Sequence, residues 1–285
     1  MSTSQAIDNS ADQPPEGVQA LMKEAVLFAD AEAQFALGKM YDQGRGVPVD
    51  RAAAAEWYRQ AAVLGHATAQ NNLGVLYDAG NGVPQDPAEA ASWFLQAAEQ
   101  GLAVAQFNLG TAYDEGRGVA KDEAEAVRWL LAAAEQGHTQ AQLDLGNFYE
   151  NGDGVPRDDA QAVFWYGQAA EKGERSGHEY LWEMCRAGRG LKHIVAWWKA
   201  AAEKGDIHSQ FSLGELYAKG LGVIQHYPLA YMWMNLAAAL ADGDLRKAFA
   251  DGRDELASSM TRLQVAEGQR LSQKWLVAFE SRHEQ

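Results

Sequence analysis

The feature that most constrains the fold of this chain is an internal repeat with a period of 36 residues. A Leu-Gly dipeptide and, later in each repeat, a tryptophan recur together at this spacing. Both landmarks lose four residues between Leu181 and Trp197 and then resume, so the chain holds six repeats, of which the fifth is shortened. Such a period predicts a solenoid, because one short unit cannot bury its apolar face without neighbours. The dipeptides are Leu37-Gly38, Leu73-Gly74, Leu109-Gly110, Leu145-Gly146 and Leu213-Gly214, and the tryptophans are Trp57, Trp93, Trp129, Trp165, Trp197 and Trp233.

Each repeat is predicted to form two helices that are joined by a glycine-rich loop. In the first repeat, Ala33, Leu37 and Tyr41 share one helical face, and the glycine beside the leucine lets the second helix approach closely. The first helix is predicted to end at a left-handed glycine, Gly44, and the second to begin after an N-cap, Asp50. Later repeats place Glu or Gln three residues after this aspartate, which predicts a capping box. The predicted N-caps are Asp50, Asp86, Asp122 and Asp158, and the second helices are predicted to bury their tryptophan and to end at Gly65, Gly101, Gly137, Gly173 and Gly205.

This pattern resembles the Sel-one-like repeat (SLR) family, whose 36-residue units are related to tetratricopeptide repeats. The resemblance rests on Ala-x-Ala-Gln-x-x-Leu-Gly-x-x-Tyr-x-x-Gly-x-Gly-Val-Pro-x-Asp, followed by Ala-x-x-Trp and Ala-Ala-x-x-Gly, over residues 31–243. It implies an all-α fold, a right-handed α/α superhelical solenoid of six helix-turn-helix repeats whose first helices line a concave groove. It also implies a bacterial protein that scaffolds protein complexes rather than an enzyme.

The segments that flank the repeats are predicted to cap the solenoid. Residues 17–30 offer Leu21, Ala25 and Phe28 on one helical face, and residues 244–285 carry an apolar stripe that includes Trp275. Thr261 and Gln264 have the spacing of a capping box within this C-terminal segment. Residues 1–16 are polar and acidic, so we expect them to be disordered. The six repeats fill residues 31–243, with the degenerate fifth repeat at residues 175–206.

The charge of the chain limits its partners. The net charge is −15, and residues 31–174 carry 21 acidic against 9 basic side chains, whereas residues 175–285 carry 13 against 14. This acidity argues against nucleic-acid binding, which needs a cationic face. No apolar run is long enough to span a membrane, and no secretion signal is recognisable. With a single cysteine in the chain, we expect a cytoplasmic protein.

Four acidic residues follow the repeated tyrosine and are predicted to form a ladder along the groove. They are Asp42, Asp78, Asp114 and Glu150. One interpretation is that each carboxylate accepts backbone N–H groups from its own Gly-x-Gly loop. The other is that the ladder attracts a basic helix or an Arg/Lys-rich tail. The tyrosines themselves, Tyr41, Tyr77, Tyr113, Tyr149 and Tyr217, keep the packing period and are predicted to be core residues.

One helical turn earlier, aromatic and amide side chains are predicted to face the same groove. Exposed phenylalanines would anchor a peptide, and asparagines would bond to its backbone. Alternatively, the phenylalanines pack between repeats, as both roles occur in tetratricopeptide-like grooves. The residues are Phe35, Phe107, Leu143 and Phe211, with Asn72, Asn108 and Asp144 beside them.

The fifth repeat is the strongest irregularity in the sequence. Trp182 replaces the glycine of close packing, Cys185 replaces the tyrosine, and the loop is shortened. The crossing of the two helices must therefore change, which could simply bend the solenoid. The alternative is an interaction hot spot made of Trp182, Trp198, Arg186 and Arg189, which are residue types enriched at interfaces. Lys192 and His193 add further positive charge.

The sequence predicts no catalytic residue, cofactor or metal site, because no CxxC, HxxxH or HExxH spacing occurs. We therefore expect an adaptor that binds a protein or peptide through its concave face, and the acidic ladder favours a basic one. One alternative is a β-lactamase-like hydrolase that uses Cys185 and His193, but that branch of the family has paired cysteines that this chain lacks. The other is an envelope or signalling regulator. The candidate partner-binding residues are Phe35, Asp42, Asn72, Asp78, Phe107, Asn108, Asp114, Asp144, Glu150, Trp182, Arg186 and Arg189.

Overall fold

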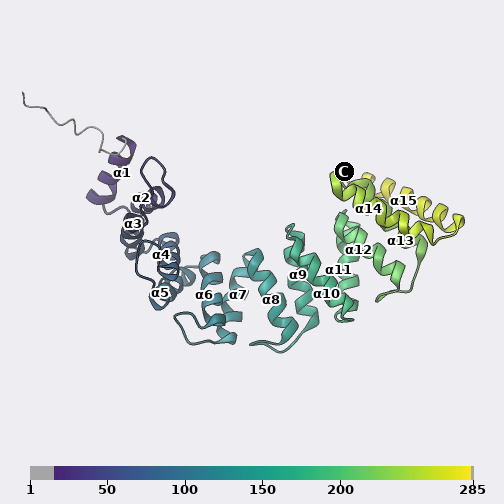
Figure 1. Cartoon of the computed structure of the whole chain (residues 1–285), viewed down its shortest axis with the longest axis horizontal. Coiled ribbons are helices and arrows are strands. Elements are labelled where there is room, and N and C mark those ends of the chain that lie inside the picture. Colours follow the sequence, from purple (N-terminus) through teal and green to yellow (C-terminus); the bar gives the residue numbers. More distant parts are fainter. Residues whose placement is uncertain (1–15, 284–285) are drawn as a thin grey trace, which may run out of the picture. The chain divides into compact units, whose positions relative to one another are not determined.

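A computed structural model describes residues 16–283, and over that range the regular secondary structure is entirely helical (Figure 1). The segment predicted to be disordered, residues 1–16, lies outside the described residues except for Glu16, which begins the first helix. The first helices of the repeats are α2 (Ala31–Gln43), α4 (Ala67–Ala79), α6 (Ala103–Glu115), α8 (Thr139–Asn151), α10 (Arg175–Arg186) and α12 (Ile207–Lys219). The second helices are α3 (Arg51–Val63), α5 (Pro87–Glu99), α7 (Glu123–Glu135), α9 (Asp159–Glu171), α11 (Leu191–Glu203) and α13 (Tyr227–Leu240). Flanking them are α1 (Glu16–Leu27), α14 (Gly243–Ser258) and α15 (Arg262–His283).

The chain forms two compact units. Unit 1 contains residues 16–141 and 153–155 of the described range, and unit 2 contains residues 142–152 and 156–283. Each unit has its own apolar core between stacked helices. The all-α, repeat-based architecture expected from the sequence is confirmed. No helix among residues 16–283 is long and apolar enough to cross a membrane.

Close packing at the Leu-Gly glycine joins the two helices of a repeat. A Cβ added to Gly38 would lie 2.5 Å from Tyr58 Cδ1, and one added to Gly74 would lie 2.7 Å from Phe94 Cε1. The residue that faces this glycine is therefore the one after the tryptophan. Tyr58 is 1% exposed, whereas Trp57 is only half-buried, so the prediction that the second helices bury their tryptophan is only partly right. Trp93 and Trp197 are also half-buried, while Trp129, Trp165 and Trp233 are buried.

Side-chain caps at the second helices are confirmed, but the capping box is not. Asp86 Oδ1 accepts the backbone N–H groups of Ala88 and Glu89 at 3.1 and 3.0 Å. The Glu89 carboxylate, however, accepts the indole N–H of Trp93 at 2.9 Å rather than the N–H of Asp86. The Asp86 N–H instead donates to Tyr77 O at 3.0 Å, so the repeat has no free donor for a box. The same backbone bond to the tyrosine recurs at Asp50, Asp122 and Asp158.

The repeated tyrosines lie at the edge of the core rather than within it. Tyr41, Tyr77, Tyr113, Tyr149 and Tyr217 are all half-buried and pack against the apolar clusters. At Tyr77 the hydroxyl accepts a hydrogen bond from Arg59 Nη2 at 2.5 Å. The prediction of core tyrosines is therefore only partly right. Gly44, which follows the first tyrosine, has the predicted left-handed conformation with φ of 70°.

A buried glutamine holds each first helix to the helix before it. Gln70 Nε2 donates to Ala62 O at 3.0 Å, and Gln34 Nε2 makes the same bond to Ala25 O at 3.1 Å. Because Ala25 belongs to α1, this helix takes the place of the second helix of an incomplete repeat. Equivalent bonds join Gln106 to Ala98 and Gln210 to Ala202.

The last two helices close unit 2 by packing on α13. Phe249 of α14 is buried against Phe211, with ring centroids 4.7 Å apart. On α15, Trp275 contacts Trp233 edge-on at 5.9 Å, as its apolar stripe predicted. Thr261 and Gln264 form the predicted capping box at the start of α15.

Candidate protein-binding surface

The acidic ladder is present, but each carboxylate already faces a cation of the same chain. In unit 1, Asp78 forms an ion pair with Arg117 of the next repeat, Nη1 to Oδ2, at 2.8 Å. The partners of the other two rungs are more distant, with Asp42 3.9 Å from Arg51 and Asp114 3.8 Å from Lys121. In unit 2, Glu150 pairs with Arg189 at 2.8 Å.

Capping of the loops by these carboxylates, one of the two interpretations from sequence, is wrong. None of the four carboxylates accepts a backbone N–H from its own Gly-x-Gly loop among the hydrogen bonds of the described residues. The last carbonyl groups of the first helix accept hydrogen bonds from backbone N–H groups of the loop and of the following N-cap. Arg45 N donates to Met40 O, and Asp50 N donates to Tyr41 O. The carboxylates are therefore left to side-chain partners.

Phe35 and Phe107 pack on the histidine that starts the next repeat. The ring of Phe35 stacks on His66 with centroids 4.4 Å apart, and Phe107 stacks on His138 at 4.5 Å. His66 is at the same time the N-cap of α4, since its Nδ1 accepts the N–H of Ala69 at 3.1 Å. Both phenylalanines are half-buried between repeats, which matches the alternative interpretation of these residues. Of the other two, Leu143 is buried and Phe211 packs on α14.

The groove asparagines form a network of their own in unit 1. Asn108 Nδ2 donates to Asn71 Oδ1 at 2.8 Å, and Asn71 Nδ2 lies 3.4 Å from Asn72 Oδ1. Burial raises the pKa of the Tyr58 hydroxyl, and a hydrogen bond from Asn72 opposes that rise. Asn72 and Asn108 are therefore engaged within the chain and half-buried. Asp144, the third residue of this set, is half-buried on α8.

The first helices carry a further strip of accessible residues, which the sequence pattern did not single out. It lies two and six residues after the Leu of each Leu-Gly dipeptide, and these positions are exposed or half-exposed in every repeat. Residues four apart share one face of a helix, so each pair forms one step of a surface. We call it the first-helix strip. It comprises Lys39, Gln43, Val75, Ala79, Thr111 and Glu115 in unit 1 and Asn147, Asn151, Glu183, Glu215 and Lys219 in unit 2.

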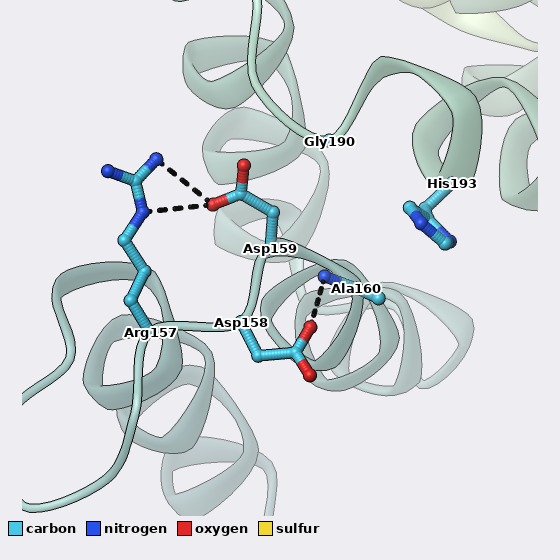
Figure 2. A pocket seen from close by; sticks show the side chains of 6 residues that line it. All are labelled: Arg157, Asp158, Asp159, Ala160, Gly190 and His193. Atoms are coloured by element: carbon cyan, nitrogen blue, oxygen red, sulfur yellow. Dashed lines mark hydrogen bonds and ion pairs between the residues drawn. The ribbon is translucent and has the colours of Figure 1, made fainter.

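The shortened loop of the fifth repeat leaves a pocket over the start of α9. In regular repeats the second loop glycine covers the first turn of the preceding second helix, as Gly118 does on Pro87. Here only Gly190 approaches, and a Cβ added to it would lie 3.5 Å from Asp159 O. A pocket of about 480 Å³ remains, lined by Arg157, Asp158, Asp159, Ala160, Gly190 and His193 (Figure 2).

The charged groups around this pocket are linked to one another. Figure 2 shows Arg157 paired with Asp159 through two contacts of 3.2 and 3.3 Å, with His193 across the pocket on α11. Arg189 Nε lies 3.6 Å from the same Asp159 oxygen, and its Nη2 pairs with Glu150. Glu150 also accepts the Tyr166 hydroxyl at 2.8 Å, and burial together with this carboxylate raises the pKa of Tyr166. Arg189 is therefore a structural cation rather than a free one.

The predicted hot spot of the fifth repeat separates into two parts. Trp198 is fully buried, so it is not available to a partner. Trp182 is half-buried, packs on Trp198 with centroids 4.8 Å apart and ring planes inclined by 46°, and donates its indole N–H to Ser212 at 3.0 Å. Arg186 is exposed with its guanidinium 5.9 Å from the Trp182 ring, and Lys219 of the first-helix strip lies 5.5 Å from the same ring.

The surroundings of Cys185 do not favour a catalytic role for its thiol. The thiol is 1% exposed, and burial raises its pKa, so the reactive thiolate is disfavoured. His193 is exposed at the pocket described above. Among residues 16–283, no group of three or more His, Cys, Asp or Glu side chains is arranged to hold a metal ion.

The repeats match the sequence model of the Sel1 repeat over residues 31–66, 67–102, 103–138, 139–174, 195–206 and 207–242. The chain belongs to the Sel1 repeat family. Of the fifth repeat only residues 195–206 are matched, as expected of a degenerate unit. Repeats of this family generally serve as scaffolds for protein–protein interactions. A comparison with curated proteins gave no match.

Solved structures with the same repeat are similar to this chain. A protective antigen of uropathogenic Escherichia coli with an SLR fold is 35% identical over 90% of this chain, with a TM-score of 0.60. This chain spans only 56% of the length of that antigen. A Sel1 repeat protein from Oxalobacter formigenes is 32% identical, with a TM-score of 0.53, and the match covers 81% of this chain and 82% of that one.

Proposed function

We propose that this protein is a non-catalytic adaptor that holds a protein partner along its first-helix strip. The observation that carries the proposal is the regular spacing of the strip: five of the six repeats present the same two helical positions to solvent, and the fifth presents Glu183. The residues there change from repeat to repeat while the Leu-Gly packing step is kept in five of the six repeats, as expected of a surface that reads a particular partner. The family's general role as a scaffold supports the same conclusion.

A partly basic partner suits unit 1 best. Its residues 16–141 and 153–155 carry 18 acidic and 8 basic side chains. Asp42 and Asp114 hold their own cations at 3.9 and 3.8 Å, so a partner's Lys or Arg could replace these weak contacts. Asp78, which is paired at 2.8 Å, is less available. The attraction would mainly steer association and would fade as salt screens it.

The single cysteine is buried and unpaired, which suits a reducing compartment. We therefore place the adaptor in the cytoplasm. The hydrolase alternative is not retained as a second proposal, because the thiol that it needs is enclosed by apolar side chains.

The proposal is tested by reversing the charge of two residues of the acidic ladder that directly precede strip residues in the sequence and, as a control, of two glutamates on the second helices. The test variant is Asp42→Lys with Asp114→Lys, and the control is Glu56→Lys with Glu125→Lys. Both change the net charge equally, and each control glutamate also pairs with one arginine of the chain, Arg59 or Arg128. Partners captured from a lysate of the source cells are identified by mass spectrometry at low and high salt.

We expect the test variant to lose a partner that wild type and the control both retain at low salt. Retention by both variants, or equal loss from both, would contradict the proposal, because net charge or another face would then explain binding. Unfolding midpoints should stay nearly unchanged, since exposed ion pairs contribute only about 0–1 kcal/mol.

A further inference from the structure

Apolar residues occupy solvent-exposed positions at one end of unit 1. The last residue of each second helix and the residue after it are exposed in all of the first five repeats. In repeats two to five these positions hold polar pairs: Glu99-Gln100, Glu135-Gln136, Glu171-Lys172 and Glu203-Lys204. In the first repeat they hold Val63 and Leu64, which are 71% and 50% exposed.

Exposed apolar residues also lie at the end of α1, the helix that precedes the repeats. Because α1 takes the place of a second helix, its end corresponds to the end of α3. Val26, Leu27 and Phe28 lie there, and they are 67%, 61% and 75% exposed. We call these three residues, together with Val63 and Leu64, the N-terminal edge patch.

The two turns that carry the patch are in contact with each other. Two residues after Leu64, His66 Nε2 lies 3.2 Å from the Glu32 carboxylate, which follows the turn after α1. The His66 ring also stacks on Phe35 of α2. The five exposed apolar side chains therefore belong to two turns that contact each other rather than to unrelated parts of the chain.

Such a cluster needs an explanation, although a single exposed apolar residue does not. The positions tolerate Glu, Gln and Lys elsewhere in the same chain, so the fold itself does not demand apolar side chains there. A contiguous apolar patch with polar neighbours is typical of an interaction site.

Charge indicates what covers the patch. The turn between α1 and α2 contains Asp30, and Glu32 beside it has a side chain that is 80% exposed. A second copy of the chain would bring the same acidic unit against this one, and the two would repel. A basic partner would instead gain both apolar contact and ionic attraction.

We propose that the N-terminal edge patch binds an amphipathic helix of a partner protein, with apolar side chains flanked by Lys or Arg. This inference rests on the proposed adaptor function and adds a second contact surface to it. The helix would place its apolar face on the five residues and its cations beside Asp30 and Glu32.

The test installs the polar pair of the second repeat in the first. Val63→Glu with Leu64→Gln reproduces Glu99-Gln100, so the fold should be retained, which circular dichroism checks. The binding probe is a synthetic amphipathic peptide of Leu and Lys, and its twin carries Glu in place of Lys. Ile224→Gln is the matched control, because Ile224 is 89% exposed but lies in the loop of the sixth repeat.

We expect fluorescence anisotropy to show binding of the Lys peptide that weakens about tenfold or more in Val63→Glu/Leu64→Gln and not in Ile224→Gln. The added glutamate would by itself strengthen attraction of the Lys peptide, so a loss can come only from the missing apolar contact. The Glu peptide should bind more weakly than the Lys peptide to wild type.

Unchanged or tighter binding in Val63→Glu/Leu64→Gln, or equal binding of both peptides, would overturn the inference. So would sedimentation that shows a wild-type dimer and a monomeric variant, because a second copy would then be the occupant. Failure of the ladder variant Asp42→Lys/Asp114→Lys to lose its partner concerns the proposed function alone, since the peptide assay does not depend on those residues.

Discussion

The two helices of a regular repeat and the two helices of the fifth repeat pack on each other in different ways. In the first, second, third and sixth repeats the two helices pack closely over a glycine, and a glutamine bonds to the helix before. In the fifth repeat Trp182 replaces the glycine and His178 replaces the glutamine. The backbones of α10 and α11 therefore pack less closely than those of the two helices in a regular repeat, and α9 packs directly on α11.

Other contacts compensate for this loosened pair. Gly177 lets α10 approach α9 closely, since a Cβ added there would lie 2.7 Å from Ala170 N. Trp182 and Trp198 fill the wider gap between α10 and α11 with rings that pack at a tilt. Arg189 ties the shortened loop back to Glu150 of the fourth repeat. A solenoid can therefore keep its core through one degenerate unit if large side chains and ion pairs replace the close backbone approach.

The largest effect expected from breaking this arrangement is at Trp198. Trp198→Ala should destabilise unit 2 by about 3–5 kcal/mol, because it removes a fully buried indole and leaves a cavity. Trp197→Ala should cost less than half as much, since Trp197 is only half-buried. Urea unfolding followed by circular dichroism measures both. Equal costs would show that the compensation does not depend on the Trp198 ring.

A smaller effect distinguishes the two kinds of helix pair. Gly74→Ala in the second repeat should cost about 1–3 kcal/mol, because the added methyl group overlaps the Phe94 ring. Trp182→Gly, although it restores the residue of the regular repeats, should also destabilise the chain, by about 1–3 kcal/mol, since it empties the gap beside Trp198. Hydrogen exchange at α10 and α11 locates the second effect. A stabilised Trp182→Gly variant would mean that the fifth repeat is merely strained.

The smallest effect concerns the residue that replaces the buried glutamine. Burial lowers the pKa of His178 below its usual 6.5, and the neighbouring His208 adds to this, while Asp206 opposes it. The unfolded chain therefore binds a proton more readily than the folded one, so the free energy of unfolding should fall as pH drops below about 6.5. His178→Gln should remove that dependence.

At neutral pH, His178→Gln should also stabilise unit 2 by about 0.5–1.5 kcal/mol, because the amide can donate to the end of α9 as in the regular repeats. Thermal unfolding of wild type and variant at several pH values measures both effects. An acid sensitivity that persists in His178→Gln would assign it to another group.

The sequence was sufficient for the helices and their caps because those features are set by neighbours along the chain. Gly44 and Asp86 could be assigned from the loop motif alone, and both adopt the expected geometry. The candidate site could be predicted less well. Asp78 was recognisable as a recurrent acid, but its pairing with Arg117 of the next repeat depends on how far apart adjacent repeats stack.

Two further features needed the folded chain. Tyr58 rather than Trp57 fills the space beside Gly38, and a one-residue difference of this kind follows from the rotation of one helix against another. The patch around Val63 and Phe28 joins the end of α3 to the end of α1, a helix that carries no Leu-Gly landmark of the repeat, and the contact between these two turns is seen only in the folded chain.

By itself, the sequence determined the number of repeats, the two helices of each, the turn residues between them and the position of the irregular unit. These follow from periodicity and from local backbone preferences, which act over a few residues. Only the tertiary structure decided which side chains are buried, which charges are already paired and which apolar residues meet at one edge. Those outcomes depend on distances between helices, and the distances emerge only when all of the side chains pack together.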